Sequence, residues 1–265
     1  MDRNSTGYTL GFAAAITIVC AVLLGFAATS LKKLQEQNAD VDKKSKILLA
    51  VGEFDPNKKI PAEQVLNFFT EEGQDGKFVV KFAVNHAGEE IKDISADELK
   101  TLDLEKQMKA HPNVKKDEAK TAENAAKRKY PLYAFYETKE AFAAKKPTNY
   151  IVPIYGYGLW SNCYGVVALD STGKTVKNLV YYKHAETPGL GGEIEKAYFS
   201  DRFKNKKVHD AEGKVALTTT KGPEDDNKVQ AISGATFTMD GVNLMLKDYL
   251  TIYGVYISKQ AGGAE

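Results

Sequence analysis

The sequence predicts an α+β protein, in which one N-terminal transmembrane helix precedes a domain with an antiparallel sheet and flanking helices. Three observations support this: an uncharged apolar run near the N-terminus, a series of short segments rich in Val, Ile and Tyr separated by Gly-containing turns, and helical periodicity near the C-terminus. The 265 residues are 43% hydrophobic and 27% charged, which suits one anchored domain or two small ones. Because the net charge is only +1, we expect no nucleic-acid partner.

The first segment, residues 1–31, is expected to be a membrane anchor in contact with lipid. No charged residue occurs from Asn4 to Leu31, and Tyr8–Ser30 is nearly all apolar. A bilayer core of about 30 Å requires roughly 20 such residues in a helix. The run is longer than the apolar core of a signal peptide, although Ala27–Ser30 offers the small residues that a cleavage site needs. The lysines at 32, 33, 43 and 44 favour a cytoplasmic domain, but large domains translocate regardless of nearby charge, so charge alone does not set the topology.

The second segment, residues 32–130, reads as a linker followed by helical and strand elements with a charged insertion. We expect a polar linker or helical extension first, and then short helices near Ile47–Val51 and after Pro61, with a strand over Lys77–Val84. The basic clusters within residues 96–129 would suit anionic lipid. They are interspersed with Ala, Asp and Glu, which favours a solvated helical insertion.

The third segment, residues 131–258, is predicted to hold most of the sheet. Strands are expected at Tyr133–Tyr136, Tyr150–Tyr155, Tyr164–Asp170, Val176–Tyr182 and Val215–Thr219. Ser171–Lys174 reads as a hairpin connection. Helical spacing predicts a C-terminal helix from Val242, Met245, Leu246, Tyr249, Leu250 and Tyr253. Cys20 and Cys163 fall in separate segments, so we expect no disulfide within the chain.

Three short motifs carry the candidate chemistry, and the first is Gln-Ala-Ile-Ser-Gly-Ala-Thr-Phe-Thr at residues 230–238. It lies between an expected extended segment and the C-terminal helix. Small residues at 234 and 235 allow an anion to approach the backbone, where free N–H groups and the helix dipole favour a phosphate. A threonine Oγ there can form a phosphodiester. Taken alone, the motif is more typical of an ordinary helix N-cap.

The second motif is His-Ala-Glu-Thr-Pro-Gly-Leu-Gly-Gly-Glu at residues 184–193. Its glycines and proline indicate a constrained loop. Gly191 and Gly192 would let the backbone lie against a planar ligand, and Glu186 and Thr187 could hydrogen-bond it. A tight structural turn is the alternative. The motif lacks the spacing of a dinucleotide-binding fingerprint.

The third motif is Pro-Ile-Tyr-Gly-Tyr-Gly-Leu-Trp at residues 153–160, which contains the single tryptophan of the chain. Trp160 and Gly158 could form a wall of a ligand pocket. The alternative is a core aromatic residue at a bend of the sheet.

In this order and combination, the motifs resemble the FMN-binding domain family found in the C subunit of Na⁺-translocating NADH:quinone oxidoreductases and in the G subunit of the related Rnf complex. The resemblance covers most of the chain. The context Gly158-Leu159-Trp160-Ser161 and the length favour the Na⁺-pumping version.

The resemblance implies a covalent FMN joined through its phosphate to Thr236, the last residue of Ser233-Gly234-Ala235-Thr236. A separate Mg²⁺-dependent flavin transferase that uses FAD would attach it. The resemblance also implies flavin contacts from Ser233, Gly234, Ala235, Glu186, Thr187, Leu190, Gly191, Gly192, Gly158 and Trp160. The family pattern usually has an acidic residue three positions before the serine, where this chain has Gln230.

The implied function is electron transfer within a six-subunit membrane complex that oxidises NADH, reduces quinone and exports Na⁺. NADH and quinone would bind other subunits, so we expect no catalytic residue and no metal site here. The implied location is the bacterial inner membrane, with the C-terminal domain on the periplasmic side. Two alternatives are the G subunit of the Rnf ferredoxin:NAD⁺ oxidoreductase complex and a flavin-free, membrane-tethered adaptor.

Overall fold

The computed structural model describes residues 6–55, 58, 60–114 and 116–262, and the chain divides into two units, Met1–Lys43 and Lys44–Glu265. Helix α1 (Thr6–Ala50) is continuous, so the short helix expected near Ile47–Val51 is its last part. Within α1, one stretch with a mean hydropathy of 2.5 is long and apolar enough to cross a membrane. The predicted N-terminal helix is confirmed, and the first five residues of the predicted anchor lie outside the described part.

The second unit contains a five-stranded antiparallel sheet in which each strand pairs with the next along the chain. Its strands are β1 (Phe78–Val84), β2 (Tyr130–Tyr136), β3 (Asn149–Tyr157), β4 (Asn162–Asp170) and β5 (Val176–Lys183). These strands confirm the predictions for this part of the chain. The β4–β5 connection is closed by Asp170, whose carboxylate accepts hydrogen bonds from the N–H groups of Thr172 and Lys174 at 3.1 Å each.

Short helices lie before β1 and in the first two connections of the sheet. They are α2 (Ala62–Asn67), α3 (Ala96–Thr101), α4 (Leu104–Ala110), α5 (Glu118–Lys127) and α6 (Lys139–Ala143). Side chains of Ser95, Asp103 and Asp117 cap α3, α4 and α5 by accepting a hydrogen bond from the first turn. Within α5, Glu123 pairs with both Lys120 and Lys127. Acidic residues therefore balance the basic residues of this helix, as expected for a solvated insertion.

After β5 the chain forms a compact run of short elements before the last helix. These are η1 (Gly191–Glu195), α7 (Ala197–Ser200), η2 (Asp201–Phe203), β6 (Thr218–Thr220) and β7 (Lys228–Gln230). The strand expected over Val215–Thr219 is realised only as β6. It pairs in parallel with β7, and the two form a separate sheet.

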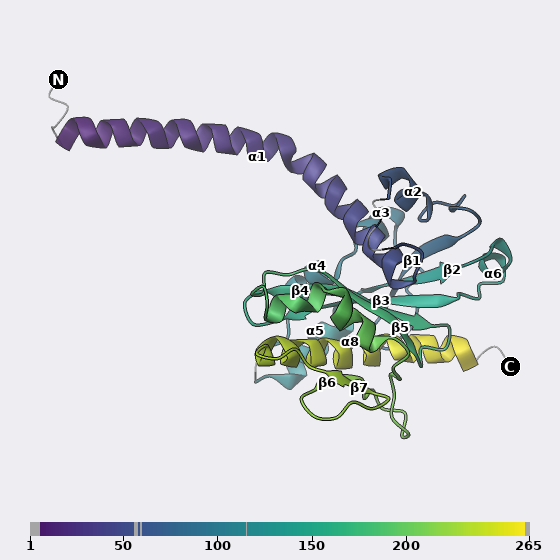
Figure 1. Ribbon diagram of the computed structural model, residues 1–265. Helices are drawn as coiled ribbons and strands as arrows, with labels where there is room; N and C mark the ends of the chain where they lie inside the picture. Colours follow the sequence, from purple (N-terminus) through teal and green to yellow (C-terminus); the bar gives the residue numbers. More distant parts are fainter. Residues whose placement is uncertain (1–5, 56–57, 59, 115, 263–265) are drawn as a thin grey trace. The chain divides into compact units, whose positions relative to one another are not determined.

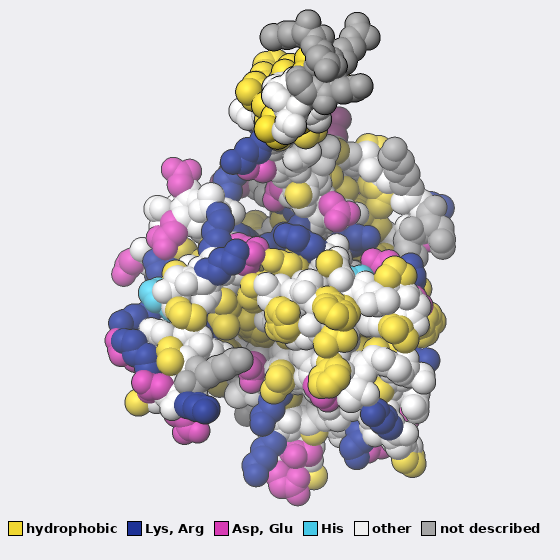
Figure 2. All heavy atoms as spheres, turned by 90° about the vertical axis from the view of Figure 1, so that its left-hand side faces the viewer, with side chains coloured by type: hydrophobic (Ala, Val, Ile, Leu, Met, Phe, Trp, Pro, Cys, Tyr) yellow, Lys and Arg dark blue, Asp and Glu magenta, His cyan; other side chains and the backbone are white. Residues whose placement is uncertain are grey.

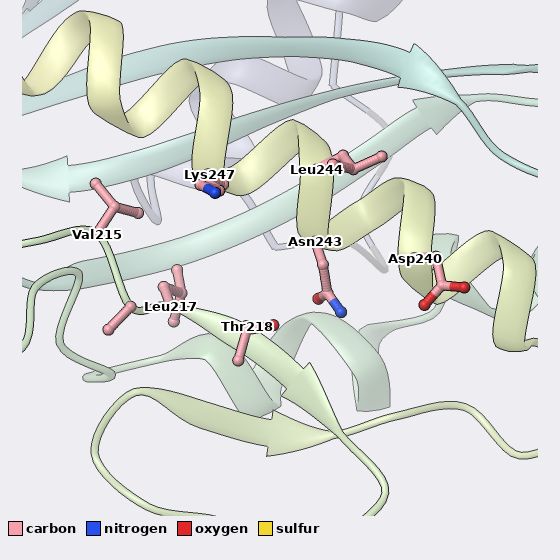
Figure 3. A pocket seen from close by; sticks show the side chains of 8 residues that line it. Val215, Leu217, Thr218, Asp240, Asn243, Leu244 and Lys247 are labelled. Atoms are coloured by element: carbon pink, nitrogen blue, oxygen red, sulfur yellow. The ribbon is translucent and has the colours of Figure 1, made fainter.

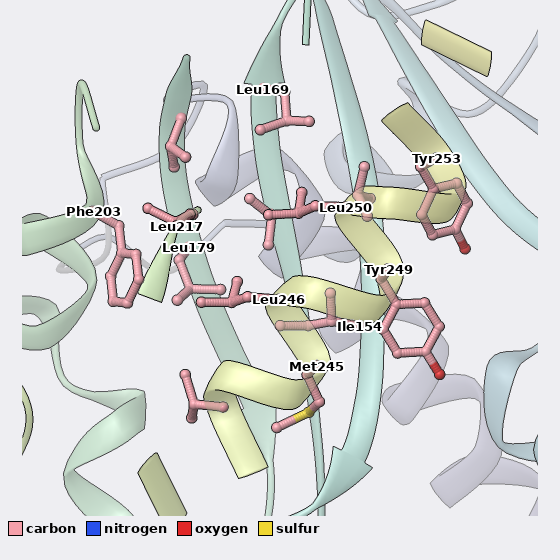
Figure 4. Packing of buried hydrophobic residues seen from close by; sticks show 14 of the residues in the cluster. Ile154, Leu169, Leu179, Phe203, Leu217, Met245, Leu246, Tyr249, Leu250 and Tyr253 are labelled. Atoms are coloured by element: carbon pink, nitrogen blue, oxygen red, sulfur yellow. The ribbon is translucent and has the colours of Figure 1, made fainter. Parts of the chain in front are cut away.

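The last helix, α8 (Thr236–Gly262), lies between the five-stranded sheet and the β6–β7 pair (Figure 1). Its apolar face packs on the sheet through Met245, Leu246, Tyr249, Leu250 and Tyr253, which meet Ile154, Leu169 and Leu179 (Figure 4). Inside this core, the Tyr253 hydroxyl donates a hydrogen bond to the carbonyl of Pro131 at 2.8 Å. The packing fixes α8 against the sheet, and with it the position of Thr236 at its first turn.

Candidate functional site

The β3–β4 turn, Gly158–Ser161, forms the first wall of the candidate site. The Gly158 N–H donates to the Ser161 carbonyl at 2.8 Å and closes the turn. The next three N–H groups all point at one carboxylate. Leu159 donates to Glu186 Oε2 at 3.0 Å, and Trp160 and Ser161 donate to Oε1 at 2.9 and 3.0 Å.

Glu186 connects this turn to α8 as well. Its side chain is buried, and Oε2 also accepts a hydrogen bond from the Thr238 hydroxyl at 2.7 Å. Burial alone would raise the pKa of Glu186, but the hydrogen bonds from Thr238 and from the three backbone N–H groups outweigh it and lower the pKa below its usual value. The sequence suggested Glu186 as a ligand contact. In the structure its two oxygens bind protein groups from two other segments.

Glycines permit the close approach of these segments. A Cβ on Gly158 would lie 2.8 Å from the Glu186 carboxyl carbon, and one on Gly191 would lie 2.4 Å from the Thr238 hydroxyl. Gly192 is buried against the Thr187 carbonyl, 3.0 Å from where its Cβ would stand. The three motifs of the sequence are thus brought together, and packing alone already requires glycine at these positions.

Gly241 shows the same requirement within α8, and it provides a test of this packing. A Cβ there would lie 2.2 Å from the Tyr157 carbonyl oxygen. Although Ala is normally the better helix residue by about 1 kcal/mol, we expect Gly241→Ala to lower the free energy of unfolding by about 1–3 kcal/mol, because backbone must move.

The matched control is Gly254→Ala in the same helix, where the nearest atom to the new Cβ is the His209 Nε2 at 3.8 Å. We expect this variant to be as stable as the wild type or more so. Urea unfolding followed by circular dichroism measures both. Equal effects of the two substitutions would contradict the packing described here.

The Ser233–Thr236 segment forms the second wall. Gly234 adopts a φ of +77°, and a Cβ on it would lie 2.9 Å from Leu190 Cδ2, so this turn lies against the glycine-rich loop. Ala235 is buried, whereas Ser233 and Thr236 are exposed. Thr236 is the first residue of α8, where the first N–H groups have no partner within the helix. A hydroxyl is therefore presented to solvent at a site that favours anions.

Two further residues belong to the site: Lys221, which sequence reasoning did not select, and Thr238, the last residue of the first motif. Lys221 donates a hydrogen bond from Nζ to Thr236 Oγ1 at 3.0 Å, and Thr238 holds Glu186. Lys221 lies 15 residues before Thr236 and is carried there by the parallel pairing of β6 with β7, which no local pattern indicates.

At the position where the family pattern is usually acidic, the chain places the exposed Gln230. Its backbone N–H donates to the carboxylate of Glu224 at 2.5 Å, and its carbonyl accepts from Arg202 at 2.7 Å. A carboxylate therefore does lie beside this position, although it comes from another part of the chain.

Large apolar side chains are exposed on the segments that meet at the site. Trp160 and Phe237 are each 67% exposed, so Trp160 is not a core aromatic residue. We use the name apolar rim for Tyr157, Leu159, Trp160, Leu190 and Phe237, all of which are exposed. Figure 2 views the molecule from the side on which α8 begins, and hydrophobic side chains gather on this face. A planar apolar group bound here would cover surface that now faces water.

A separate cavity of about 390 Å³ lies one turn further along α8, between Asp240–Lys247 and residues 215–218 (Figure 3). It does not include the apolar rim. Within it, Asn243 points from α8 toward β6, and its Oδ1 accepts a hydrogen bond from the Thr219 N–H at 2.7 Å. This contact ties β6, and the lysine that follows it, to the beginning of α8.

The site lies within the part of the chain that is similar to a known family. A family model for the FMN-binding domain matches residues 158–251, from the β3–β4 turn into α8. The C subunit of the Na⁺-translocating NADH-quinone reductase of Vibrio campbellii is 32% identical, over 91% of this chain and 89% of that protein. The corresponding protein of Yersinia pestis is 30% identical, over 99% of this chain and 96% of its own length.

Two solved structures have a similar fold. The crystal structure of the C subunit of the Na⁺-translocating NADH-quinone reductase from Parabacteroides distasonis covers 86% of this chain and 97% of its own, with a TM-score of 0.62 and 27% sequence identity. That of Shewanella oneidensis NqrC covers 85% of this chain and 100% of its own, with a TM-score of 0.61 and 25% identity.

Proposed function

Because the chain belongs to the family formed by the C subunits of Na⁺-translocating NADH-quinone reductases, we propose that it is a membrane-anchored electron carrier with FMN joined through its phosphate to Thr236. In this proposal it works with the other subunits of a six-subunit complex that couples NADH oxidation and quinone reduction to Na⁺ export. It binds neither NADH nor quinone itself.

The observation that carries the proposal is the setting of the Thr236 hydroxyl. It is exposed at the start of α8, beside the Lys221 ammonium and next to the apolar rim. The helix N-terminus and the ammonium suit a phosphate, and the rim suits a planar aromatic ring. The phosphate and the ring of FMN would therefore both meet groups of suitable charge or polarity on one face of the molecule.

Attachment requires a separate transferase with FAD as its substrate. Thr236 Oγ forms a bond to the phosphorus that carries riboflavin, and the bond from that phosphorus to the AMP oxygen breaks. The hydroxyl proton passes to a base of the transferase, and AMP leaves. Thr236 is thus the bearer of the cofactor and not a catalyst.

Bound FMN supplies the electron chemistry, while the protein positions it and limits its contact with water. Glu186 holds the β3–β4 turn and α8 together. The proposed flavin contacts are Ser233, Gly234, Ala235, Glu186, Thr187, Leu190, Gly191, Gly192, Gly158 and Trp160. Among these, the exposed Leu190 and Trp160 offer the largest apolar surface.

The candidate span in α1 would anchor the chain in the bacterial inner membrane. We place the following domain on the periplasmic side. A covalent tether is useful there, because a non-covalent cofactor would be lost to the medium.

The direct test is flavin fluorescence of the denatured full-length chain under ultraviolet light after gel electrophoresis. Co-expression with an active flavin transferase should give a fluorescent band that survives denaturation, and expression without it should give a dark band. A dark band under both conditions would refute the proposal and favour the flavin-free adaptor.

A further inference from the structure

We propose that Lys221 is the phosphate-binding residue of the site, and that its ammonium pairs with the FMN phosphate at Thr236. This inference rests on the proposed function and adds a residue to it. The starting observation is the hydrogen bond from Lys221 Nζ to Thr236 Oγ1 at 3.0 Å. The phosphorus of a Thr236 ester would be bonded to that same oxygen, so its anionic oxygens would lie within reach of the ammonium.

The strand that leads into Lys221 is held by two other parts of the chain. Lys221 directly follows β6, and the Thr219 N–H in β6 donates to Asn243 of α8 at 2.7 Å. The Thr220 carbonyl accepts from the Ala231 N–H at 2.8 Å, which joins β6 to the segment leading into Ser233. Both connections run to the elements that present Thr236. The lysine is therefore positioned by the same structure that positions the hydroxyl.

Other lysines in this region are paired with carboxylates. Lys228 binds Asp225 at 2.8 Å, and Lys207 binds Asp226 at 2.5 Å. In the part of the chain that the structure describes, no carboxylate lies within 4.0 Å of the Lys221 ammonium. A hydroxyl accepts only one of the three hydrogen bonds that an ammonium donates. The arrangement leaves Lys221 available to an anion placed at Thr236.

The charge balance favours this pairing. A free FMN phosphate carries up to two negative charges and the phosphodiester carries one. The positive end of the α8 dipole supplies about half a charge near Thr236, and Lys221 supplies a full one. Hydrogen bonds between ionised partners are also shorter and stronger than neutral ones.

The experiment uses the full-length chain, purified in detergent from cells without the transferase, and titrates it with FMN and with riboflavin, which lacks the phosphate. Quenching of flavin fluorescence gives both affinities. We expect Lys221→Gln to weaken FMN binding about three- to tenfold and to leave riboflavin binding unchanged, since only FMN carries the anion. Lys221→Arg should restore FMN binding. Lys228→Gln, which removes an exposed lysine from the first residue of β7, is the matched control and should behave as the wild type.

A second readout is the fraction of chains that carry FMN after co-expression with the transferase, measured by intact mass. We expect this fraction to fall in Lys221→Gln. If free FMN binds too weakly for its affinity to be measured, the fraction of modified chains alone tests the role of Lys221. Wild-type occupancy together with wild-type FMN affinity in Lys221→Gln would overturn the role of Lys221 and leave the proposed function standing. A wild-type chain that takes up no flavin would overturn both.

Discussion

Replacement of Thr236 by Ala is expected to remove all covalent flavin and to leave the protein folded. Thr236 is exposed, and its hydroxyl oxygen accepts a hydrogen bond from Lys221, which is itself exposed. Loss of this hydroxyl should therefore change the free energy of unfolding by no more than about 1 kcal/mol. Intact mass after co-expression with the transferase should show only the unmodified chain, and circular dichroism should match the wild type.

Two matched variants make this result specific. Ser233→Ala removes another exposed hydroxyl of the same segment and should still carry covalent flavin on Thr236, because Ser233 is a proposed flavin contact and not the attachment residue. Thr236→Ser retains a hydroxyl at the same position and should retain at least part of the occupancy. Covalent flavin on Thr236→Ala, or its loss from Ser233→Ala alone, would identify a different attachment residue.

Replacement of Glu186 by Gln should have the largest effect on the stability of the site. The carboxylate accepts from the N–H groups of Leu159 and Trp160 and from the Thr238 hydroxyl. A glutamine has one acceptor oxygen, so its NH₂ group would face donors that it cannot bind. We expect the free energy of unfolding to fall by about 3 kcal/mol, because hydrogen bonds to a buried charged group are lost and donors are left unpaired.

The single tryptophan provides a local reporter for this change, because the backbone N–H of Trp160 donates a hydrogen bond to Glu186. Its fluorescence should change in Glu186→Gln under conditions in which circular dichroism still shows a folded chain. Glu195→Gln is the control, since Glu195 is exposed, pairs with Lys196 at 3.0 Å and lies 3.4 Å from His184 Nε2, without binding the β3–β4 turn. That substitution should cost less than about 1 kcal/mol. Wild-type stability and fluorescence in Glu186→Gln would show that Glu186 does not hold the site together.

The same carboxylate predicts a pH dependence. The folded protein lowers the pKa of Glu186 below its ordinary value of 4.5, because the hydrogen bonds it accepts favour the ionised form over the effect of burial. The stabilisation is therefore fully present above about pH 4.5 and is lost as the pH falls through the lower pKa of the folded state. The stability difference between wild type and Glu186→Gln should accordingly be constant near neutral pH and shrink below pH 4.5. A difference that shrank only on raising the pH would contradict this assignment.

The sheet and the last helix could be predicted from the sequence, because each strand and the helix show a recognisable pattern within a short stretch of residues. Short β-branched and aromatic segments between turns predict β2 to β5, and apolar residues at helical spacing predict α8. The sequence leaves the continuity of α1 open, because residues 32–45 are polar and suit either a linker or a helical extension. They remain helical as far as Ala50.

The hydrogen bonds of Glu186 and Lys221 at the site join residues that are far apart in the sequence, so the sequence did not predict them. Glu186 is predicted to contact the ligand from its glycine-rich loop, and the structure adds hydrogen-bond partners that lie 25 to 27 residues before it and 52 residues after it. The approach of Lys221 to Thr236 depends on a parallel β6–β7 pair of three residues per strand, which is too short to show a pattern. The motifs therefore located the site, whereas the hydrogen bonds that organise it required the fold.

Mass spectrometry tests most directly whether the flavin is attached at Thr236. The chain is co-expressed with the flavin transferase and digested with a protease, and the peptide that contains Thr236 is analysed. We expect a mass increase equal to FMN less water, with fragmentation that places it on Thr236. An unmodified peptide from cells with an active transferase, or the same mass increase on another residue, would refute the assignment of Thr236 as the bearer of FMN.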